Sequence, residues 1–474
     1  MAHLLESSSF HNPILKLSDE SLEKQVNEIT KGFKLTKDQL NGIREKFLYE
    51  INLGLNDPSK AGSKECSLHM INTYIVNLPN GQEIGDFLSL DLGSTNFRVC
   101  LSTLSPNQSD QFNVKYYDIP DELRKGTSEM LFNHITECVG SFMEDYPRLK
   151  DQTTLLGFTF SYPMKQEAID VGKLVTWTKS YDIKDAIGQN AAESLQKSID
   201  RKGLNIRVAA ILNDSSGTLV KGIYLDQDCG VGVIMGSGFN ACYLEKVEKV
   251  TSFKKNTNLG SERVLINLEC GGFGDNGCID FAKTSFDKEV DQDSLFPGSF
   301  SYEKLFSGVF IGDLARRVMI EVASKGLLFN GKVTEQLKNK DSFTAEHIST
   351  IEGDENNAKT KEIITKNLGY ANFSNDDVEI VKYICAILSV RTALFIGILL
   401  STLIERIDKP LTKIAIDGSL YKHHPKVPKL MTDFIKELAP GRKFDHFLAE
   451  DGSGKGAGLV VAALARERLL KGSL

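Results

Sequence analysis

The distribution of apolar and polar residues predicts helices near the start of the chain and strands after residue 80. Apolar residues recur at helical spacing through the segment 18–55. Within it, Thr36-Lys37-Asp38-Gln39 fits a capping box, in which side chains satisfy the free N–H groups of a first helical turn. We therefore expect residues 18–55 to be helical, with a linker near 54–63.

Two strand-turn-strand patterns follow, each built around a glycine turn. The first joins residues 87–92 to 97–101, and the second joins 232–235 to 241–244. Apolar strands on both sides of a short glycine turn are typical of β-hairpins. Their likeness to each other is compatible with an old duplication, one copy in each domain.

The second half of the chain alternates between helical patterns and strands. Helical patterns cover 302–331 and 376–406, and a strand followed by a turn is expected at 414–419. Residues 450–456 are interpreted as a glycine-rich turn that leads into a last helix, 457–470. This alternation of strands and helices indicates an α/β fold.

Two other segments of the second half lead to opposite expectations about burial. Residues 337–375 are polar and charged, and they are predicted to form a solvated excursion on the surface. Thr392 to Ile404 is the longest apolar stretch, with 13 residues. It is too short to span a bilayer and predicts a buried core helix.

Length and charge narrow the class of protein. A chain of 474 residues fits two domains or one large split domain. A net charge of −7 argues against a role on nucleic acid or on a membrane surface. The eight cysteines form no CxxC pair, and residues 1–20 show no signal-peptide pattern. We expect a cytoplasmic protein with reduced thiols and no integral membrane segment.

The most informative candidate for chemistry is Asp214, in the run Leu212 to Leu219. It follows an apolar strand and lies in sequence between two glycine-rich turns, 91–96 and 236–240. Glycine permits positive φ and lets backbone N–H groups approach an anion, although either turn alone fits an ordinary hairpin. A third glycine turn at 417–419 favours phosphate. A base between phosphate-binding turns predicts phosphoryl transfer to a hydroxyl.

Several other motifs have ordinary explanations. Gly454-Lys455 is followed by glycine and lacks the first glycine of a Walker A motif, so we exclude a P-loop. The single tryptophan, Trp177, is predicted to lie in the core, with Thr178 and Lys179 offering a hydroxyl and a cation beside it. His423-His424 lacks a third metal ligand at sensible spacing and is predicted to lie on the surface.

Taken in order, these segments resemble the hexokinase family. The resemblance extends from about residue 80 to 465. The matching motifs are the sugar-binding signature at Leu156–Pro163 with Trp177-Thr178-Lys179, the first phosphate motif at Asp91–Arg98, the second at Gly236–Asn240, the adenosine-side motif at Asp417–Lys422, and the C-terminal turn at Glu450–Gly456.

The resemblance implies an actin-like ATPase (ribonuclease H-like) fold, with two α/β lobes around a catalytic cleft. Residues 80–212 plus 456–474 would form the small lobe, and 1–79 plus 213–455 the large lobe. The length fits a single unit of the animal type. The implied reaction is transfer of a phosphoryl group from ATP to the 6-hydroxyl of a hexose, glucose first and also mannose or fructose. The implied partners are the hexose and Mg-ATP, bound by a monomer.

The family's roles carry over onto matching residues of this chain. Asp214 would be the general base, with Lys179 as the second catalytic residue. The sugar would be bound by Ser161, Thr178, Lys179, Asn213, Asp214, Asn240, Glu269 and Glu303. ATP would be bound by Gly93, Ser94, Thr95, Asn96, Arg98, Gly236, Ser237, Gly238, Asp417, Gly418, Ser419, Gly452 and Ser453. Asp91 would bind Mg²⁺ through water.

Five positions depart from the family's usual pattern: Ser94, Ser180, Phe239, Cys270 and Phe300. Ser94 stands where glycine is usual, and Phe300 stands where a glutamine near the sugar is usual. We interpret these changes as a sugar-pocket rim that has become partly apolar. Two alternatives to an ordinary hexokinase follow, namely a hexose sensor with little catalysis and a kinase for a modified hexose such as N-acetylglucosamine.

Overall fold

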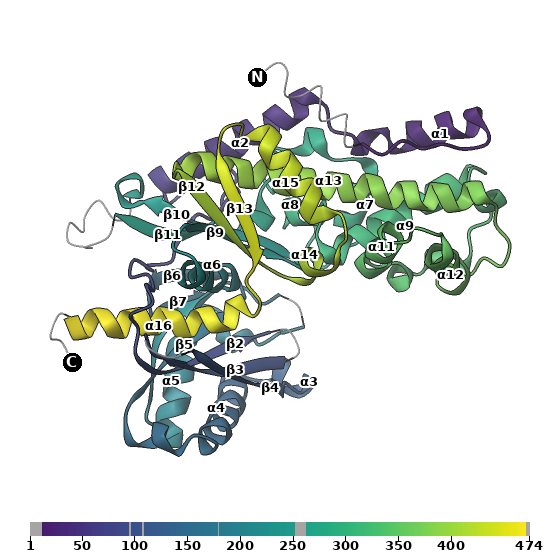
Figure 1. Cartoon of the computed structure of the whole chain (residues 1–474). Coiled ribbons are helices and arrows are strands. Elements are labelled where there is room, and N and C mark those ends of the chain that lie inside the picture. Colours follow the sequence, from purple (N-terminus) through teal and green to yellow (C-terminus); the bar gives the residue numbers. More distant parts are fainter. Residues whose placement is uncertain (1–11, 94–95, 107–108, 179, 252–261, 471–474) are drawn as a thin grey trace.

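The computed structural model describes residues 12–93, 96–106, 109–178, 180–251 and 262–470, and it contains two separate β-sheets (Figure 1). The five-stranded sheet has the order β4-β3-β2-β5-β8. Its strands are β2 (Gly85–Leu92), β3 (Asn96–Leu104), β4 (Gln111–Asp118), β5 (Thr154–Phe160) and β8 (Ile206–Leu212).

The six-stranded sheet has the order β1-β11-β10-β9-β12-β13. Its strands are β1 (Ile71–Asn72), β9 (Cys229–Met235), β10 (Phe239–Lys246), β11 (Arg263–Asn267), β12 (Leu411–Asp417) and β13 (Lys443–Leu448). A small ribbon, β6 (Met164–Ala168) with β7 (Val171–Leu174), completes the strands. Both predicted hairpins are confirmed, because β2 pairs antiparallel with β3 and β9 pairs antiparallel with β10.

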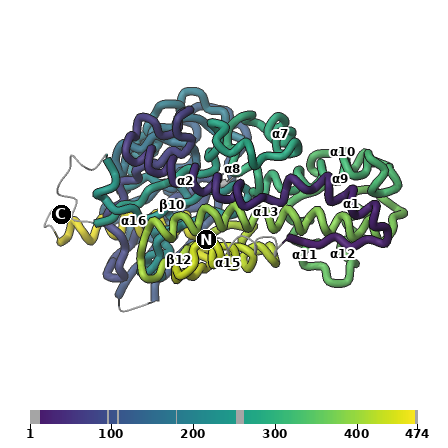
Figure 2. Tube along the Cα trace, turned by 90° about the horizontal axis from the view of Figure 1, so that it is seen from above, coloured from purple at the N-terminus to yellow at the C-terminus, as the bar shows by residue number. Residues whose placement is uncertain are grey.

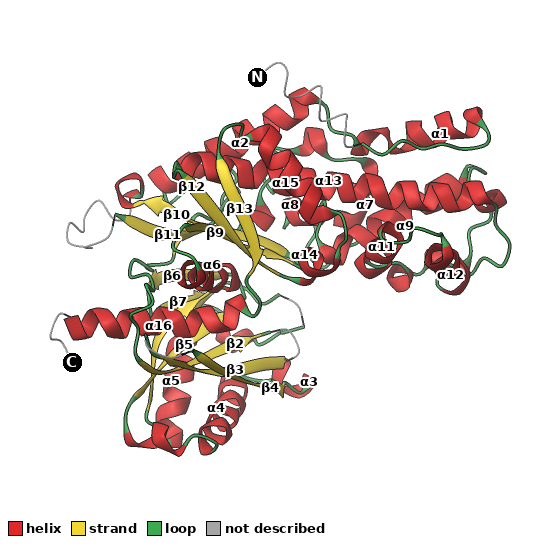
Figure 3. Ribbon diagram, viewed as in Figure 1, coloured by secondary structure: helices red, strands yellow, loops and turns green. Residues whose placement is uncertain are grey.

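Helices cover both sheets (Figure 3). They are α1 (Glu20–Thr30), α2 (Lys37–Asn56), α3 (Asp121–Arg124), α4 (Ser128–Glu144), α5 (Ala191–Lys202), α6 (Asp214–Leu225), α7 (Ser285–Gln292), α8 (Ser301–Lys304), α9 (Gly308–Ser324), α10 (Glu335–Lys338), α11 (Ala345–Glu352), α12 (Ala358–Lys366), α13 (Asn375–Ile407), α14 (Ser419–His423), α15 (Val427–Leu438) and α16 (Gly452–Leu470). The predicted capping box is present at the start of α2, where Thr36 and Gln39 exchange hydrogen bonds.

Helix α6 links the two sheets. It contacts β9 and β12 of the six-stranded sheet and also α16, which covers β2, β3 and β5 of the five-stranded sheet. The five-stranded sheet is built from residues 85–212 and the six-stranded sheet from 71–72 and 229–448. The exact lobe boundaries at 79, 212 and 455 stay predictions. Helix α16 itself begins at Gly452, so the expected turn at 450–456 already contains the first residues of this helix.

The segment 337–375 is not the solvated excursion that its polarity predicted. It contains α10, α11 and α12, whose residues Ile348, Ile351 and Ile364 are buried at 0–1% exposure with α9 and α13. Figure 2 shows these helices gathered with α1 around one end of α13. Few apolar residues are enough here because they lie on one side of their helices and face the core formed with α9 and α13.

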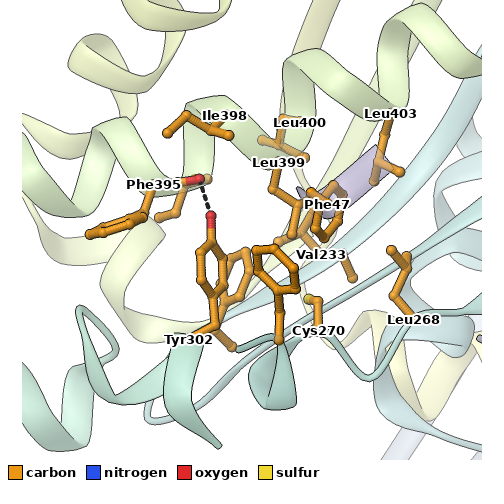
Figure 4. Close-up of a cluster of buried hydrophobic side chains, with 14 of the residues drawn as sticks. Phe47, Val233, Leu268, Cys270, Tyr302, Phe395, Ile398, Leu399, Leu400 and Leu403 are labelled. Atoms are coloured by element: carbon orange, nitrogen blue, oxygen red, sulfur yellow. Dashed lines mark hydrogen bonds between the residues drawn. The ribbon is translucent and has the colours of Figure 1, made fainter. Parts of the chain in front are cut away.

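Helix α13 is the core helix that the apolar stretch predicted. It has 33 residues, and within the described part of the chain it is the single helix long and apolar enough to cross a bilayer. In its most apolar stretch of 18 residues, 94% of the residues are buried inside the protein. In Figure 4, Phe395, Leu399 and Leu403 of this helix pack with Phe47, Leu268 and Tyr302, and the Tyr302 hydroxyl donates a hydrogen bond of 2.6 Å to the carbonyl of Phe395.

The crossing of α6 and α16 requires glycine. A Cβ added at Gly456 would lie 1.9 Å from the carbonyl oxygen of Gly217, and one added at Gly217 would lie 2.5 Å from that of Ser453. Real Cβ atoms do not approach backbone oxygen so closely. The two helices therefore touch through their backbones, which explains the glycines at positions 217 and 456.

We expect Gly456→Ala to destabilise the protein by at least about 1–3 kcal/mol, because the helices would have to separate. Urea unfolding measures this loss. Gly140 of α4 is the matched control, since a Cβ there would lie 3.7 Å from its nearest neighbour, in ordinary contact. Gly140→Ala should be neutral or stabilising. Equal stability of the two variants would contradict the crossing geometry.

His424 is buried, and the prediction that it lies on the surface is wrong. Only 3% of it is exposed, whereas His423 is exposed. Its Nδ1 accepts hydrogen bonds of 3.2 Å from the backbone N–H groups of Lys426 and Val427, and its Nε2 lies 3.1 Å from the hydroxyl of Ser389. Burial, with a smaller contribution from Lys426, lowers the pKa of His424 to about 4.

This burial predicts a loss of stability in acid. The pKa of a histidine is about 6.5 in an unfolded chain, so the folded state disfavours protonation. The stabilisation is complete above pH 6.5 and falls, by up to about 3 kcal/mol, as the pH drops toward 4. We expect His424→Gln to flatten this part of the pH–stability curve in urea unfolding. His423→Gln should leave the curve unchanged, and parallel curves for the native protein and His424→Gln would contradict the assignment.

Candidate active site

The ends of three parallel strands bring candidate residues to one edge of the five-stranded sheet. Leu92 pairs with Phe160, and Thr159 pairs with Leu212. The residues that follow these strands are Gly93, Ser161 and Asn213, so all three leave the sheet at the same edge. Carboxyl ends of parallel strands are the usual place for ligands in α/β proteins. Thr178, another predicted sugar-binding residue, lies in the loop after β7 and is half-buried.

Asn213 and Asp214 are fixed by the start of α6. Asn213 is the N-cap residue, and its side chain accepts a hydrogen bond of 3.1 Å from the N–H of Ser216. Asp214 is the first residue of the helix, and its Oδ1 accepts a 2.7 Å bond from the N–H of Ser215. A carboxylate is favourable there because the helix dipole is positive at this end. The backbone of the predicted base is therefore held in place at the N-terminus of α6.

A cluster of amides surrounds the carboxylate of Glu269. Its Oε1 lies 3.4 Å from the Nδ2 of Asn213 and 3.4 Å from the Nδ2 of Asn240. Glu269 follows β11 in a left-handed conformation with φ 50°. Three of the predicted sugar-binding residues, which come from the start of α6, from β10 and from the end of β11, thus meet at one place.

Glu303 joins the same region through the second glycine turn. Its Oε2 accepts a 2.8 Å hydrogen bond from the N–H of Phe239, the residue before Asn240. A Cβ at Gly238 would lie 2.7 Å from that oxygen, so the turn can approach the carboxylate only with glycine there. The close approach of Glu303 therefore explains the glycine at position 238 of the second phosphate motif.

The two glycine turns of the six-stranded sheet lie side by side. Strands β9 and β12 are parallel and adjacent, with Ile234 opposite Asp417, so Gly236 and Gly418 leave the sheet together. Gly418 has φ 127°, and a Cβ there would lie 2.4 Å from the carbonyl of Met235. Ser237 and Ser419 follow these two glycines in sequence.

An ion-pair network joins the first motif to the start of α16. The guanidinium of Arg98 donates to Asp91 Oδ2 at 2.7 and 3.0 Å, to Asp451 at 2.6 Å and to the hydroxyl of Ser453 at 2.6 Å. Burial alone would lower the pKa of Arg98, but Asp91 and Asp451 outweigh it and raise the pKa. Because these donors are used within the protein, Arg98 fixes neighbouring groups in this state, and its contact with ATP stays a prediction.

The carboxylates of this network are the groups that could hold Mg²⁺ beside ATP. Among the described residues, Oδ1 of Asp91 has no hydrogen-bond partner, which leaves one oxygen for a water ligand of Mg²⁺. Nearby, Asp417 Oδ2 accepts a 3.0 Å bond from the N–H of Gly452, and burial raises the pKa of Asp417. The donor set therefore fits the predicted Mg²⁺ bound through water.

Three predicted residues, Ser94, Thr95 and Lys179, lie outside the described residues, and the side chain of Asn96 does too. A cavity of about 300 Å³ lies among other residues of the chain. It is lined by Asp275, Ser301 and Lys304 with their neighbours and by none of the predicted sugar-binding residues.

Two of the five departures do not lie on a pocket rim. Phe239 is 3% exposed and packs its ring 4.9 Å from that of Phe306, and Cys270 is fully buried. Both side chains belong to the core, so their prediction as apolar rim residues is wrong. Ser180 is exposed and its hydroxyl accepts a 2.8 Å bond from Arg124. Phe300 is half-buried, with φ 58° and its ring 6.1 Å from that of Phe296.

The single tryptophan lies in the core, as predicted. Trp177 is 6% exposed, and its Nε1 donates a 2.8 Å bond to the carbonyl of Ile183. Its ring packs against those of Tyr162 and Tyr181, which also contact each other. The Tyr162 hydroxyl donates to the carbonyl of Gly93 at 2.8 Å, which ties the first glycine turn to the sugar-binding signature.

Comparison with known proteins decides the family. Family models described as hexokinase match residues 25–224 and 230–463. The chain belongs to the hexokinase family. It is 38% identical over 455 residues to "Hexokinase HKDC1" of Mus musculus and 37% identical over 454 residues to "Hexokinase-1" of the same species. These alignments cover 94% of this chain but 48% and 46% of those proteins, so the chain spans about half the length of its curated relatives.

Solved hexokinase structures are similar to this structure in fold. A hexokinase from Schistosoma mansoni complexed with glucose has a TM-score of 0.85 and 36% identity, covering 94% of this chain and all of that one. Another hexokinase crystal structure has a TM-score of 0.80 and 26% identity, with the same coverage. The predicted α/β fold of two lobes is confirmed.

Two residues that complete the cluster were not identified from the sequence. Ser215 and Asn267 both bond to the predicted sugar-binding residues. Neither was assigned a role from the motifs, and only the three-dimensional contacts reveal them.

Proposed function

We propose that this hexokinase-family chain transfers the γ-phosphoryl group of ATP to the 6-hydroxyl of a hexose. The observation that carries the proposal is the meeting of Asn213, Asn240 and Glu269 beside Asp214 at the start of α6. A hexose presents several hydroxyls, and fixed amides and carboxylates are the groups that accept and donate to them in a specific orientation.

The proposed chemistry needs one proton transfer. The 6-hydroxyl oxygen attacks the γ-phosphorus while Asp214 accepts the hydroxyl proton, and ADP leaves. Glu269, Asn240 and Glu303 hold the remaining hydroxyls, so the reacting oxygen has one orientation. Mg²⁺ bound with ATP supplies charge neutralisation on the phosphates, and Asp91 would hold it through water.

Glucose is the first proposed substrate, with mannose and fructose next. The alternative of a modified hexose depended on apolar replacements around the sugar. Since Phe239 and Cys270 lie in the core, Phe300 is the one described apolar replacement that still supports it. The sensor alternative depended on Ser94 as well as Phe300. The monomeric state and the cytoplasmic location stay predictions.

A coupled assay of ADP formation tests the proposal. With Mg-ATP and separate additions of glucose, mannose, fructose and N-acetylglucosamine, we expect sugar-dependent turnover that is fastest with glucose. Turnover restricted to N-acetylglucosamine would favour the modified-hexose kinase. Glucose binding by calorimetry without ADP formation at high enzyme concentration would favour the sensor.

A further inference from the structure

Asn267 occupies the centre of the amide cluster, although no motif marks it. It is the last residue of β11 and is 3% exposed. Its Nδ2 donates a 2.6 Å hydrogen bond to Oε1 of Glu269, and its Oδ1 accepts a 2.9 Å bond from Nδ2 of Asn240. One buried amide thus contacts two predicted sugar-binding residues at once.

The Asn267 contact is the shortest one that Glu269 makes in the cluster. The amides of Asn213 and Asn240 lie 3.4 Å from the same Oε1, against 2.6 Å for Asn267. A hydrogen bond to an ionised group is stronger than one between neutral groups. The position of the Glu269 carboxylate therefore depends more on Asn267 than on either predicted sugar ligand.

The surrounding hydrogen bonds allow only one orientation of the Asn267 amide. Its Oδ1 accepts from Asn240 and also from the N–H of Glu269 at 3.3 Å, and the hydroxyl of Ser215 lies 3.5 Å from it. The oxygen is thus surrounded by donors, so the NH₂ group must point at the Glu269 carboxylate. Flipping this amide would place oxygen against oxygen and nitrogen against nitrogen.

We propose that Asn267 is a positioning residue for hexose binding, which fixes Glu269 and Asn240 from behind without contacting the sugar. This inference rests on the proposed function. Glu269 has a left-handed backbone at φ 50°, a conformation that a non-glycine residue adopts only when its surroundings hold it. The hydrogen bond from β11 supplies such a restraint.

Asn267→Asp tests the proposal because it keeps the shape but replaces the donating NH₂ with a second carboxylate oxygen. Two ionised carboxylates at 2.6 Å repel each other, so the pair should lose its hydrogen bond when both are ionised at high pH and share one proton at lower pH. At pH 8 we expect the Kd for glucose to rise about 10- to 100-fold, from loss of a hydrogen bond to a charged group. At pH 6 the shared proton should restore much of the affinity. The value of kcat should fall less than Kd rises, because Asp214 is untouched.

Asn72→Asp is the matched control. Asn72 lies in β1, which pairs with β11, and its Oδ1 accepts a 2.9 Å bond from the N–H of Tyr74. The native protein and Asn72→Asp should show no comparable gain in glucose affinity between pH 8 and pH 6. If the native protein itself fails to bind glucose, the proposed function is wrong and this inference falls with it.

The double variant N267D/E269Q separates positioning from folding. It leaves one carboxylate, at position 267, and places at position 269 an amide that can donate to it. The double variant should therefore fold. Its glucose affinity, which is lowered because Glu269 is itself a predicted sugar ligand, should not depend on pH between 6 and 8. Native-like glucose affinity of Asn267→Asp at pH 8 would overturn the proposal. A loss of glucose affinity in Asn267→Asp that is the same at every pH would also overturn it, and so would a double variant that does not fold. Either result would mean that Asn267 only stabilises the sheet.

Discussion

Asp214→Asn should lower kcat for glucose phosphorylation by a factor of about 10²–10⁴, the usual contribution of a general base. Asparagine keeps the shape and the place at the first position of α6, but it cannot accept the hydroxyl proton. The affinity for glucose should change much less, because Asn213, Asn240 and Glu269 still bind the ring hydroxyls. Turnover by the coupled assay and Kd by calorimetry measure the two quantities separately.

Asp38→Asn is the matched control for this substitution. Asp38 also lies in the first turn of a helix, α2, but it is exposed and belongs to no predicted motif of the site. It should leave kcat and Kd unchanged. Native turnover by Asp214→Asn would exclude Asp214 as the base, and a large loss of glucose affinity with unchanged kcat would reassign it to binding.

Asp287→Ala should destabilise the protein by about 3–5 kcal/mol, the largest loss of stability we expect from a single substitution. Arg391 and Asp287 form a two-point ion pair at 2.8 and 2.9 Å, with side chains 0% and 2% exposed. The guanidinium also lies against the rings of Phe33 and Phe395. Without Asp287 the arginine would remain buried and lack its counter-ion.

Urea unfolding of two further variants isolates this effect. The double variant Asp287→Leu, Arg391→Met removes both charges, so its loss should be clearly smaller than that of Asp287→Ala. Glu362→Ala removes an exposed ion pair with Lys366 and should leave the unfolding midpoint unchanged. A double variant as unstable as Asp287→Ala would show that the unpaired charge is not the cause, and would assign the loss to packing and to the hydrogen bonds that Thr284 donates to Asp287.

Local patterns predicted local structure well. Both hairpins, the capping box at Thr36 and the core helix containing Thr392 to Ile404 depend on neighbouring residues, so the sequence displays them directly. The residues around Glu269 were found through the family resemblance instead. An isolated glutamate carries no local signal, and Asn213, Asn240 and Glu269 come together only through the packing of α6 against the six-stranded sheet.

The wrong predictions have physical causes of the same kind. The glycines of the segment 450–456 and its match to the family's C-terminal turn predict a turn there, but α16 begins at Gly452, and the close contact with Gly217 requires glycine at position 456. The sequence predicts His424 on the surface because the His423-His424 pair lacks a third metal ligand, yet two backbone N–H groups and Ser389 satisfy its ring in the core. Gly217 and Ser389 lie far from these positions in the sequence, so local patterns do not display these contacts.

The most direct test of the central claim is to identify the product. The purified protein is incubated with Mg-ATP and glucose, and the product is examined by correlated ³¹P and ¹H NMR. We predict a phosphorus signal coupled to the two protons on carbon 6 of glucose, accumulating in step with ADP. ADP that accumulates with inorganic phosphate alone, or phosphate attached at another carbon, would contradict the assignment of this site as a hexose 6-kinase.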